Sequence, residues 1–141
     1  MVTESTGPAS DRWVMVRLLA GATLLVVIAV GLGSRSDSFR SIPILGHSFG
    51  DGAWSVAAYV VIRILFPAAS VRAVAITALV VAFLVECSQL WHPAWLDELR
   101  SNGLVALFIG RGFLWVDLVA YVVGVAVIAM LDAVFRRRFL N

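Results

Sequence analysis

The stretch AVAITALVVAFLVECSQLW, which runs from Ala73 to Trp91, decides the fold class of this chain. Crossing the hydrocarbon core of a bilayer takes roughly 20 mostly apolar residues, and this stretch supplies that length with Glu86 as its single charged residue. A charge at that depth costs about 2.5 to 3.5 kcal/mol of insertion free energy unless it faces a partner or a polar cavity. The stretch therefore predicts a transmembrane helix, and Glu86 predicts a polar site within it.

The composition of the whole chain points the same way. Hydrophobic residues make up 61% of the 141 residues, charged residues make up 14%, and the mean hydropathy is +0.95. Soluble globular domains rarely reach such values. No polar segment is long enough to bury a core of its own, so a separate soluble catalytic domain is excluded. We therefore predict an all-α fold, a polytopic membrane protein built as one compact bundle.

Four stretches have the character of membrane spans, which predicts four transmembrane helices: Trp13–Gly33, Asp51–Phe66, Ala73–Trp91 and Phe113–Phe135. The segment between Pro93 and Phe113 is apolar in its middle but too short to cross, so we expect a short re-entrant or interfacial segment there. Residues 1–12 are polar and predict a disordered cytoplasmic tail. Residues 13–141 then form a single four-helix transmembrane domain.

The distribution of the eleven basic residues, all arginine, predicts the orientation. The side that holds both termini carries seven of them: Arg12, Arg17, Arg63, Arg72, Arg136, Arg137 and Arg138. The other side carries four: Arg35, Arg40, Arg100 and Arg111. Because cytoplasmic loops are enriched in basic residues, we expect a multi-pass protein of the bacterial cytoplasmic (inner) membrane with both termini in the cytoplasm.

A set of polar residues gathers towards the predicted outer face. Asp117 lies in the fourth span as Glu86 lies in the third, and Asp51 opens the second span. Gln89 follows Glu86 by three residues and Tyr121 follows Asp117 by four, so each pair shares a helix face. With the arginines of the flanking loops, the candidate site residues are Arg35, Asp51, Glu86, Gln89, Arg100, Arg111, Asp117 and Tyr121.

Three interpretations of this set stay open. The charges could pin the helices together, or they could line an outward-facing pocket for a phosphate or sugar headgroup. Alternatively, Glu86 and Asp117 could act as acid and base on a lipid-linked substrate. His47 and His92 are too isolated for a metal site, and we expect no metal and no cofactor. The expected partners are membrane lipid, with an anionic lipid or a lipid-linked envelope precursor as candidate ligand, and no nucleic acid.

Several motifs resemble a known bacterial family: ECSQL at 86–90, WLD at 95–97, GRGFLWVDLVAYVVG at 110–124, LGSR at 32–35 and GDGAW at 50–54. The family is the uncharacterised domain of unknown function 2809, which is similar in turn to VanZ-like proteins. The resemblance implies a small four-helix integral membrane protein whose family polar positions are Arg35, Asp51, Glu86, Gln89, Arg100, Asp117 and Tyr121. VanZ-like relatives are associated with glycopeptide (teicoplanin) resistance and envelope phenotypes, and they tend to carry Asn where this chain has Tyr121.

We therefore expect an integral membrane protein of the bacterial cell envelope, a non-enzymatic binding or accessory factor with an outward-facing cluster of arginines and carboxylates. By resemblance it is VanZ-like and related to glycopeptide resistance. The alternative is a membrane enzyme that acts on a lipid-linked phosphate or glycan substrate with Glu86 and Asp117.

Overall fold

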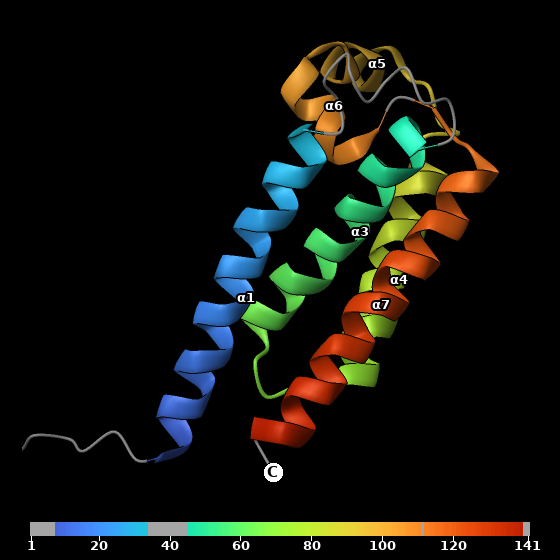
Figure 1. Ribbon diagram of the computed structural model, residues 1–141. Helices are drawn as coiled ribbons and strands as arrows, with labels where there is room; N and C mark the ends of the chain where they lie inside the picture. The colour runs from blue at the N-terminus through green and yellow to red at the C-terminus, as the bar shows by residue number, and fades with distance from the viewer. Residues whose placement is uncertain (1–7, 34–44, 111, 140–141) are drawn as a thin grey trace, which may run out of the picture.

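The computed structural model describes residues 8–33, 45–110 and 112–139, and all regular structure in these ranges is helical. Four long helices run alongside one another (Figure 1): α1 (Pro8–Gly33), α3 (Leu45–Leu65), α4 (Val71–Ser88) and α7 (Trp115–Phe139). Two short helices connect α4 to α7: α5 (Ala94–Ser101) and α6 (Gly103–Ile109). The prediction of an all-α chain is confirmed for the described ranges.

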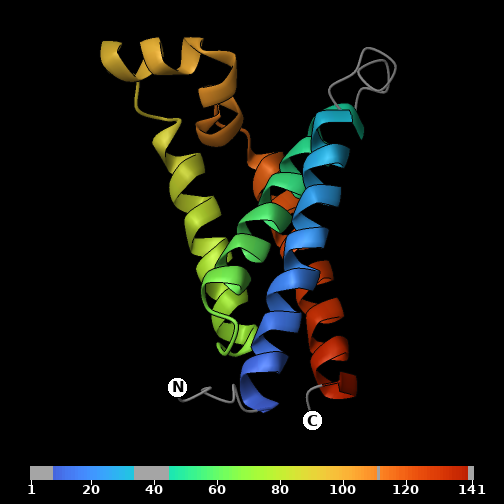
Figure 2. The same cartoon turned by 90° about the vertical axis from the view of Figure 1, so that its left-hand side faces the viewer.

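Successive long helices run in opposite directions (Figures 1 and 2). One end of the bundle, here called the terminal end, holds the start of α1, the turn between α3 and α4, and the end of α7. The opposite end, here called the α5–α6 end, holds those two short helices. Helix α3 contacts α1, α4 and α7 and is the central element, whereas α1 packs mainly against α3.

Local chemistry explains where several helices begin and end. The hydroxyl of Ser70 accepts a hydrogen bond from the Ala73 amide at 3.1 Å and caps the start of α4. The side chain of Asn102 caps α6 in the same way, by accepting from the amides of Leu104 and Val105. Gly110 ends α6 with φ of 69°, in the left-handed region that glycine adopts without strain.

Some boundaries differ from the predicted ones. Helix α1 begins at Pro8 rather than Trp13, and residues 1–7 of the predicted tail lie outside the described residues. Helix α3 begins at Leu45 rather than Asp51, so it includes a stretch with Gly and Ser, which have low helix propensity. The segment predicted as one re-entrant or interfacial element is divided into α5 and α6 at Asn102.

The distribution of side chains is that of a protein whose solvent is lipid. Large apolar side chains such as Leu25, Val119 and Leu104 point outwards and are mostly exposed. Buried positions include six polar or charged side chains: Ser55, Arg63, Glu86, Gln89, Arg100 and Asp117. Soluble proteins show the reverse pattern, because they keep large apolar patches away from water. This distribution, with three apolar helices in the described ranges long enough to cross a bilayer, is consistent with a multi-pass membrane protein.

The predicted count of four spans does not follow from the helices of the described ranges. By length and apolar composition, three helices are able to cross a membrane: Asp11–Gly33, Val71–Ser88 and Trp115–Phe139. The apolar part of α3 is the shorter Gly52–Leu65, because the first turns of this helix contain Gly, Ser and His. Helix α3 nevertheless lies inside the bundle, where protein rather than lipid surrounds much of it.

Small residues let the helices approach closely. A Cβ atom added to Gly124 of α7 would lie 2.5 Å from the Ser55 hydroxyl and 2.8 Å from the Gly52 carbonyl oxygen of α3. A Cβ atom on Gly21 of α1 would meet nothing within 4 Å. Gly124 thus allows α7 to pack closely against α3, as small residues do at contacts between membrane helices.

Candidate functional site

A carboxylate lies at the centre of the α5–α6 end. Glu86 is 0% exposed, and three donors from different parts of the chain converge on its two oxygens. The Gln89 side-chain amide donates at 3.0 Å, the Tyr121 hydroxyl at 2.9 Å, and the backbone N–H of Leu114 at 2.8 Å. We call Glu86, Gln89, Asp117 and Tyr121 the carboxylate junction, because it joins α4, α7 and the connection that precedes α7.

Regular spacing in two helices builds this junction. The buried stripe of α4 is Val74, Ala78, Ala82 and Glu86, and the buried stripe of α7 is Asp117, Tyr121 and Val125. A spacing of four residues keeps each stripe on one helix face. The alanines of α4 carry little bulk, so α4 and α7 pack together and the polar ends of both stripes meet. The junction therefore continues an apolar helix contact towards the α5–α6 end.

Neighbouring residues shape the junction further. Asp117 is 6% exposed and lies one turn before Tyr121, whose ring packs against Trp54 of α3 with the centroids 5.8 Å apart. The Gln89 amide lies against Gly110, where a Cβ atom would come within 2.5 Å of the Gln89 Cδ atom. Gly110 therefore provides the space that Gln89 needs to reach Glu86.

Arg100 has different partners from those the sequence suggested. This side chain is 4% exposed and donates to the carbonyl oxygens of Ser88 and Trp91, both at 2.8 Å. It also forms a longer ion pair of 3.4 Å with Asp97. The last carbonyls of a helix lack intrahelical donors, and a cation is favourable there. Arg100 thus closes the end of α4 and holds α5 across it.

The remaining predicted site residues cannot be placed at the side-chain level. Arg35 and Arg111 lie outside the described residues. Asp51 belongs to α3, and its side chain lies outside the described ones. Of the eight candidates, the structure brings Glu86, Gln89 and Tyr121 into direct contact and places Asp117 on the same stripe of α7.

A second buried polar cluster lies near the terminal end, and sequence reasoning missed it. Arg63 of α3 is 3% exposed and forms an ion pair of 2.5 Å with Asp132 of α7. The Tyr59 hydroxyl donates to the same Asp132 oxygen at 2.5 Å, and Arg63 also donates to the Ala69 carbonyl oxygen at 2.6 Å. We call Tyr59, Arg63 and Asp132 the Arg63–Asp132 cluster.

Two signals in the sequence could have revealed this cluster. Asp132 lies inside the fourth apolar span, as Asp117 does, and a carboxylate there needs a partner. Tyr59 and Arg63 are four residues apart and therefore share a face of α3. In the prediction of orientation, Arg63 counts only as one positive charge.

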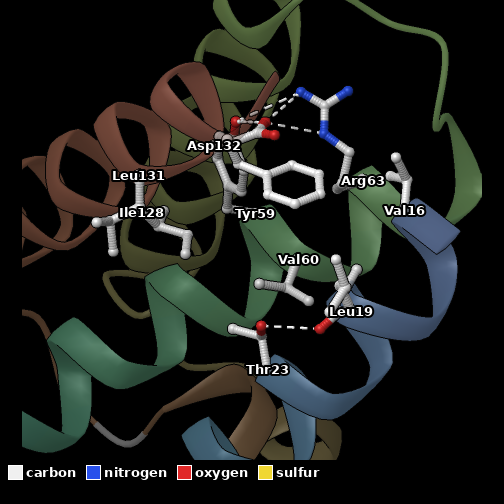
Figure 3. Close-up of a pocket in the computed structure, with 11 residues that line it drawn as sticks. Val16, Leu19, Thr23, Tyr59, Val60, Arg63, Ile128, Leu131 and Asp132 are labelled. Carbon is white, nitrogen blue, oxygen red and sulfur yellow. Dashed lines mark hydrogen bonds and ion pairs between the residues drawn. The ribbon is translucent and has the colours of Figure 1, made fainter. Parts of the chain in front are cut away.

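The Arg63–Asp132 cluster forms one end of a groove of about 340 Å³ between α1, α3 and α7 (Figure 3). Apart from this cluster and Thr23, the side chains that line the groove are apolar. Val16 and Phe135 lie near the same end as the cluster, and Thr23 and Ile128 line the groove further along α1 and α7. Cavities of this size fall at the lower end of the range for small-molecule sites.

Metal-binding residues do not gather within the described part of the chain, where no group of three or more His, Cys, Asp or Glu side chains is placed to hold an ion. His92 lies 3.1 Å from the Asp97 carboxylate, and both side chains are exposed.

Comparison with known proteins agrees with the motifs. No solved structure matches the chain. A family model matches residues 42–125, more than half of the 141 residues, and this range includes the carboxylate junction, Tyr59 and Arg63. The chain belongs to the family described as Protein of unknown function (DUF2809).

Proposed function

We propose that this protein is a non-enzymatic binding factor of the bacterial cell envelope, which holds the hydroxyl-rich headgroup of an envelope lipid or a lipid-linked glycan precursor. The observation that carries this proposal is the carboxylate junction, where two buried carboxylates and an amide lie beside aromatic rings of α3 and α7. Carboxylate oxygens accept hydrogen bonds from hydroxyl groups, and aromatic faces supply apolar contact area. Few but well-placed polar groups are typical of ligand sites.

The hydrogen bonds of Glu86 favour binding over catalysis. A general acid or base must reach the proton that it transfers, at about 2.6 to 3.2 Å or through one water molecule. Glu86 is fully buried, and its oxygens already accept from three donors of the protein. Its role in the proposal is to position Tyr121 and the start of α7, while Asp117 and Trp54 would meet the headgroup.

Hydroxyl groups fit this end better than a phosphate does. The two carboxylates of the junction can only accept hydrogen bonds when ionised. The Arg100 guanidinium already donates to the carbonyl oxygens of Ser88 and Trp91 at the end of α4. Recognition of a phosphate would rest on Arg35 and Arg111, which lie outside the described residues. The kinship with VanZ-like proteins that the motifs imply stays a prediction, as does a role in glycopeptide resistance.

In the proposed orientation the α5–α6 end faces outwards from the inner membrane and both termini face the cytoplasm. The arginine count supports this orientation. The return of α3 and α7 to the terminal end supports a four-pass path in which α3 crosses within the bundle (Figure 2). The headgroup site would then open towards the outer leaflet.

Thermal stability in nanodiscs tests the proposal. The probe is monoglucosyl-diacylglycerol, and the comparison lipid is diacylglycerol with the same acyl chains. We expect the sugar lipid to raise the melting temperature, and we expect Asp117→Asn to abolish most of that increase. Glu98→Gln, which changes an exposed carboxylate on α5, should leave it intact.

Two results would count against the proposal. If the sugar lipid never raises the melting temperature while Glu86→Ala and Asp117→Ala unfold the protein, the junction has a structural role alone. If mass spectrometry shows that the protein converts the sugar lipid into a product, the alternative of a membrane enzyme that uses Glu86 and Asp117 replaces it.

A further inference from the structure

The groove between α1, α3 and α7 has the form of a site for a hydrocarbon chain. On α1 the wall runs from Val16 to Thr23, a distance of roughly 10 Å at 1.5 Å per residue, and its lining residues before Thr23 are apolar. Ile128 and Leu131 of α7 form the facing wall, as Figure 3 shows. It is not enclosed, and its α1 and α7 walls belong to helices whose outer faces are apolar and exposed.

The polar end of the groove carries no net charge. The Arg63 guanidinium and the Asp132 carboxylate neutralise each other, and the Tyr59 hydroxyl donates to the same carboxylate. An ion pair with its hydrogen bonds satisfied tolerates an apolar neighbour, whereas an unpaired charge does not. The groove interior therefore suits an apolar chain rather than a charged group.

Arginines gather at the terminal end, next in sequence to residues that line the groove. Arg17 follows the groove residue Val16, and Arg136 follows the groove residue Phe135. Arg17 donates to the Ile64 carbonyl oxygen at 3.2 Å, and Arg136 donates to the Pro67 carbonyl oxygen at 3.0 Å. A guanidinium group has five N–H donors, so these bonds orient both arginines and leave donors for a ligand.

Other residues add positive charge at this end of the bundle. Arg136 lies over the ring of Trp13 at 5.8 Å, and tryptophan prefers the headgroup level of a membrane. Arg12, Arg137 and Arg138 are exposed at the same end of the bundle. An acidic lipid has an apolar chain and a negatively charged headgroup. The apolar groove matches the chain, and the arginines beside Trp13 match the headgroup.

We propose that an anionic glycerophospholipid occupies this groove, with one acyl chain between α1 and α7 and its phosphate at Arg17 and Arg136. The site lies at the opposite end of the bundle from the carboxylate junction and does not depend on the function proposed there. The bound chain fills the space between α1 and α7, which otherwise contact each other little along this stretch. The lipid thus becomes a structural partner of α1.

Lipid titration of the purified protein in neutral detergent micelles tests this site. The probes are phosphatidylglycerol and phosphatidylcholine with identical acyl chains, and bound lipid is counted by native mass spectrometry. Each arginine near an anionic headgroup favours binding about fivefold. We therefore expect a preference of roughly 25-fold for phosphatidylglycerol, whose headgroup carries a net negative charge, and Arg136→Gln should lower that preference about fivefold.

Variants that fill the groove separate a seated lipid from general attraction to the surface. Thr23→Phe places a ring in the groove, and Leu131→Trp does so from the opposite wall. Both should lower phosphatidylglycerol binding at least about tenfold. Leu25→Phe makes a similar addition on the same helix, at an exposed position outside the groove, and should bind as the wild type does.

The proposal is overturned if the wild-type protein binds both lipids equally, or if Thr23→Phe and Leu131→Trp retain full phosphatidylglycerol binding while folded. It is also overturned if soluble glycerol phosphate competes as well as the lipid does, because the acyl chain would then contribute nothing. Should one groove variant fail to fold, the other variant and the Arg136→Gln comparison decide the result.

Discussion

Replacing Glu86 with alanine tests the energetic role of the carboxylate junction. The substitution removes the acceptor of three hydrogen bonds at a fully buried position. Hydrogen bonds between membrane helices contribute about 0.6 kcal/mol on average and up to about 1.7 kcal/mol. Loss of all three, with the cavity that the missing side chain leaves, should lower the free energy of unfolding by about 2 to 4 kcal/mol.

A double-mutant cycle isolates the contact between α4 and α7. Tyr121→Phe removes one of the three donors and should cost about 0.6 to 1.7 kcal/mol. Because the two single variants lose the same hydrogen bond, the loss in the double variant should be smaller than their sum by about 0.5 to 1.5 kcal/mol. The assay is reversible unfolding in mixed micelles of a mild detergent and sodium dodecyl sulfate, followed by circular dichroism.

Glu98→Ala is the matched control, since it removes an exposed carboxylate from the same end and should change stability by less than about 0.5 kcal/mol. Glu86→Ala as stable as this control would refute the reasoning. Strict additivity of the Glu86 and Tyr121 variants would show that their hydrogen bond contributes no free energy.

Three other changes have outcomes that the structure predicts. Gly124→Ala should destabilise the protein by about 1 to 3 kcal/mol, because the added Cβ atom would overlap α3. Gly21→Ala should be neutral or stabilise α1 by up to about 1 kcal/mol. Unfolding in mixed micelles compares the two variants, and equal effects would contradict the close approach of α7 to α3. Asp132→Ala should lower the free energy of unfolding by about 3 to 5 kcal/mol, because it leaves the Arg63 guanidinium buried without its carboxylate. The double variant Arg63→Met with Asp132→Leu should recover most of that loss. The same assay measures both, and a double variant as unstable as Asp132→Ala would contradict this account of the ion pair. Arg100→Met should lower the free energy of unfolding by about 1.5 to 3 kcal/mol and speed amide hydrogen exchange in α5 and in the last turn of α4. Unchanged exchange would show that Arg100 does not stabilise the end of α4.

Several residues of the candidate site could be predicted, because a charged side chain within an apolar span needs a polar partner or a polar cavity. Glu86 and Asp117 stood out as charges within apolar spans, and helical spacing placed Gln89 and Tyr121 beside them. In the structure Gln89 and Tyr121 both donate to Glu86. Helical spacing indicated the shared face of Glu86 and Gln89, whereas the bond from Tyr121 joins two separate helices. The partner of Arg100 could not be predicted, since a backbone carbonyl is an acceptor that no sequence pattern distinguishes.

The number of membrane spans was harder to predict for a related reason. The apolar part of α3 is short, and its first turns contain residues that are typical of loops. Helix α3 is also the central helix of the described bundle, in contact with α1, α4 and α7. The composition of a segment gives its average polarity. It does not indicate whether lipid or protein surrounds the segment, so it does not fix the number of membrane spans.

The sequence by itself determined that this chain is helical and belongs in a membrane, because long apolar runs can satisfy their backbone hydrogen bonds in lipid only by forming helices or closed barrels. Only the tertiary structure decided which polar groups meet. Arg63 and Asp132 are 69 residues apart, and their contact depends on how α3 packs against α7. The groove beside them depends on a third helix, α1. Such contacts arise from the relative placement of separate helices, whereas the periodicity of one helix records only which face it buries.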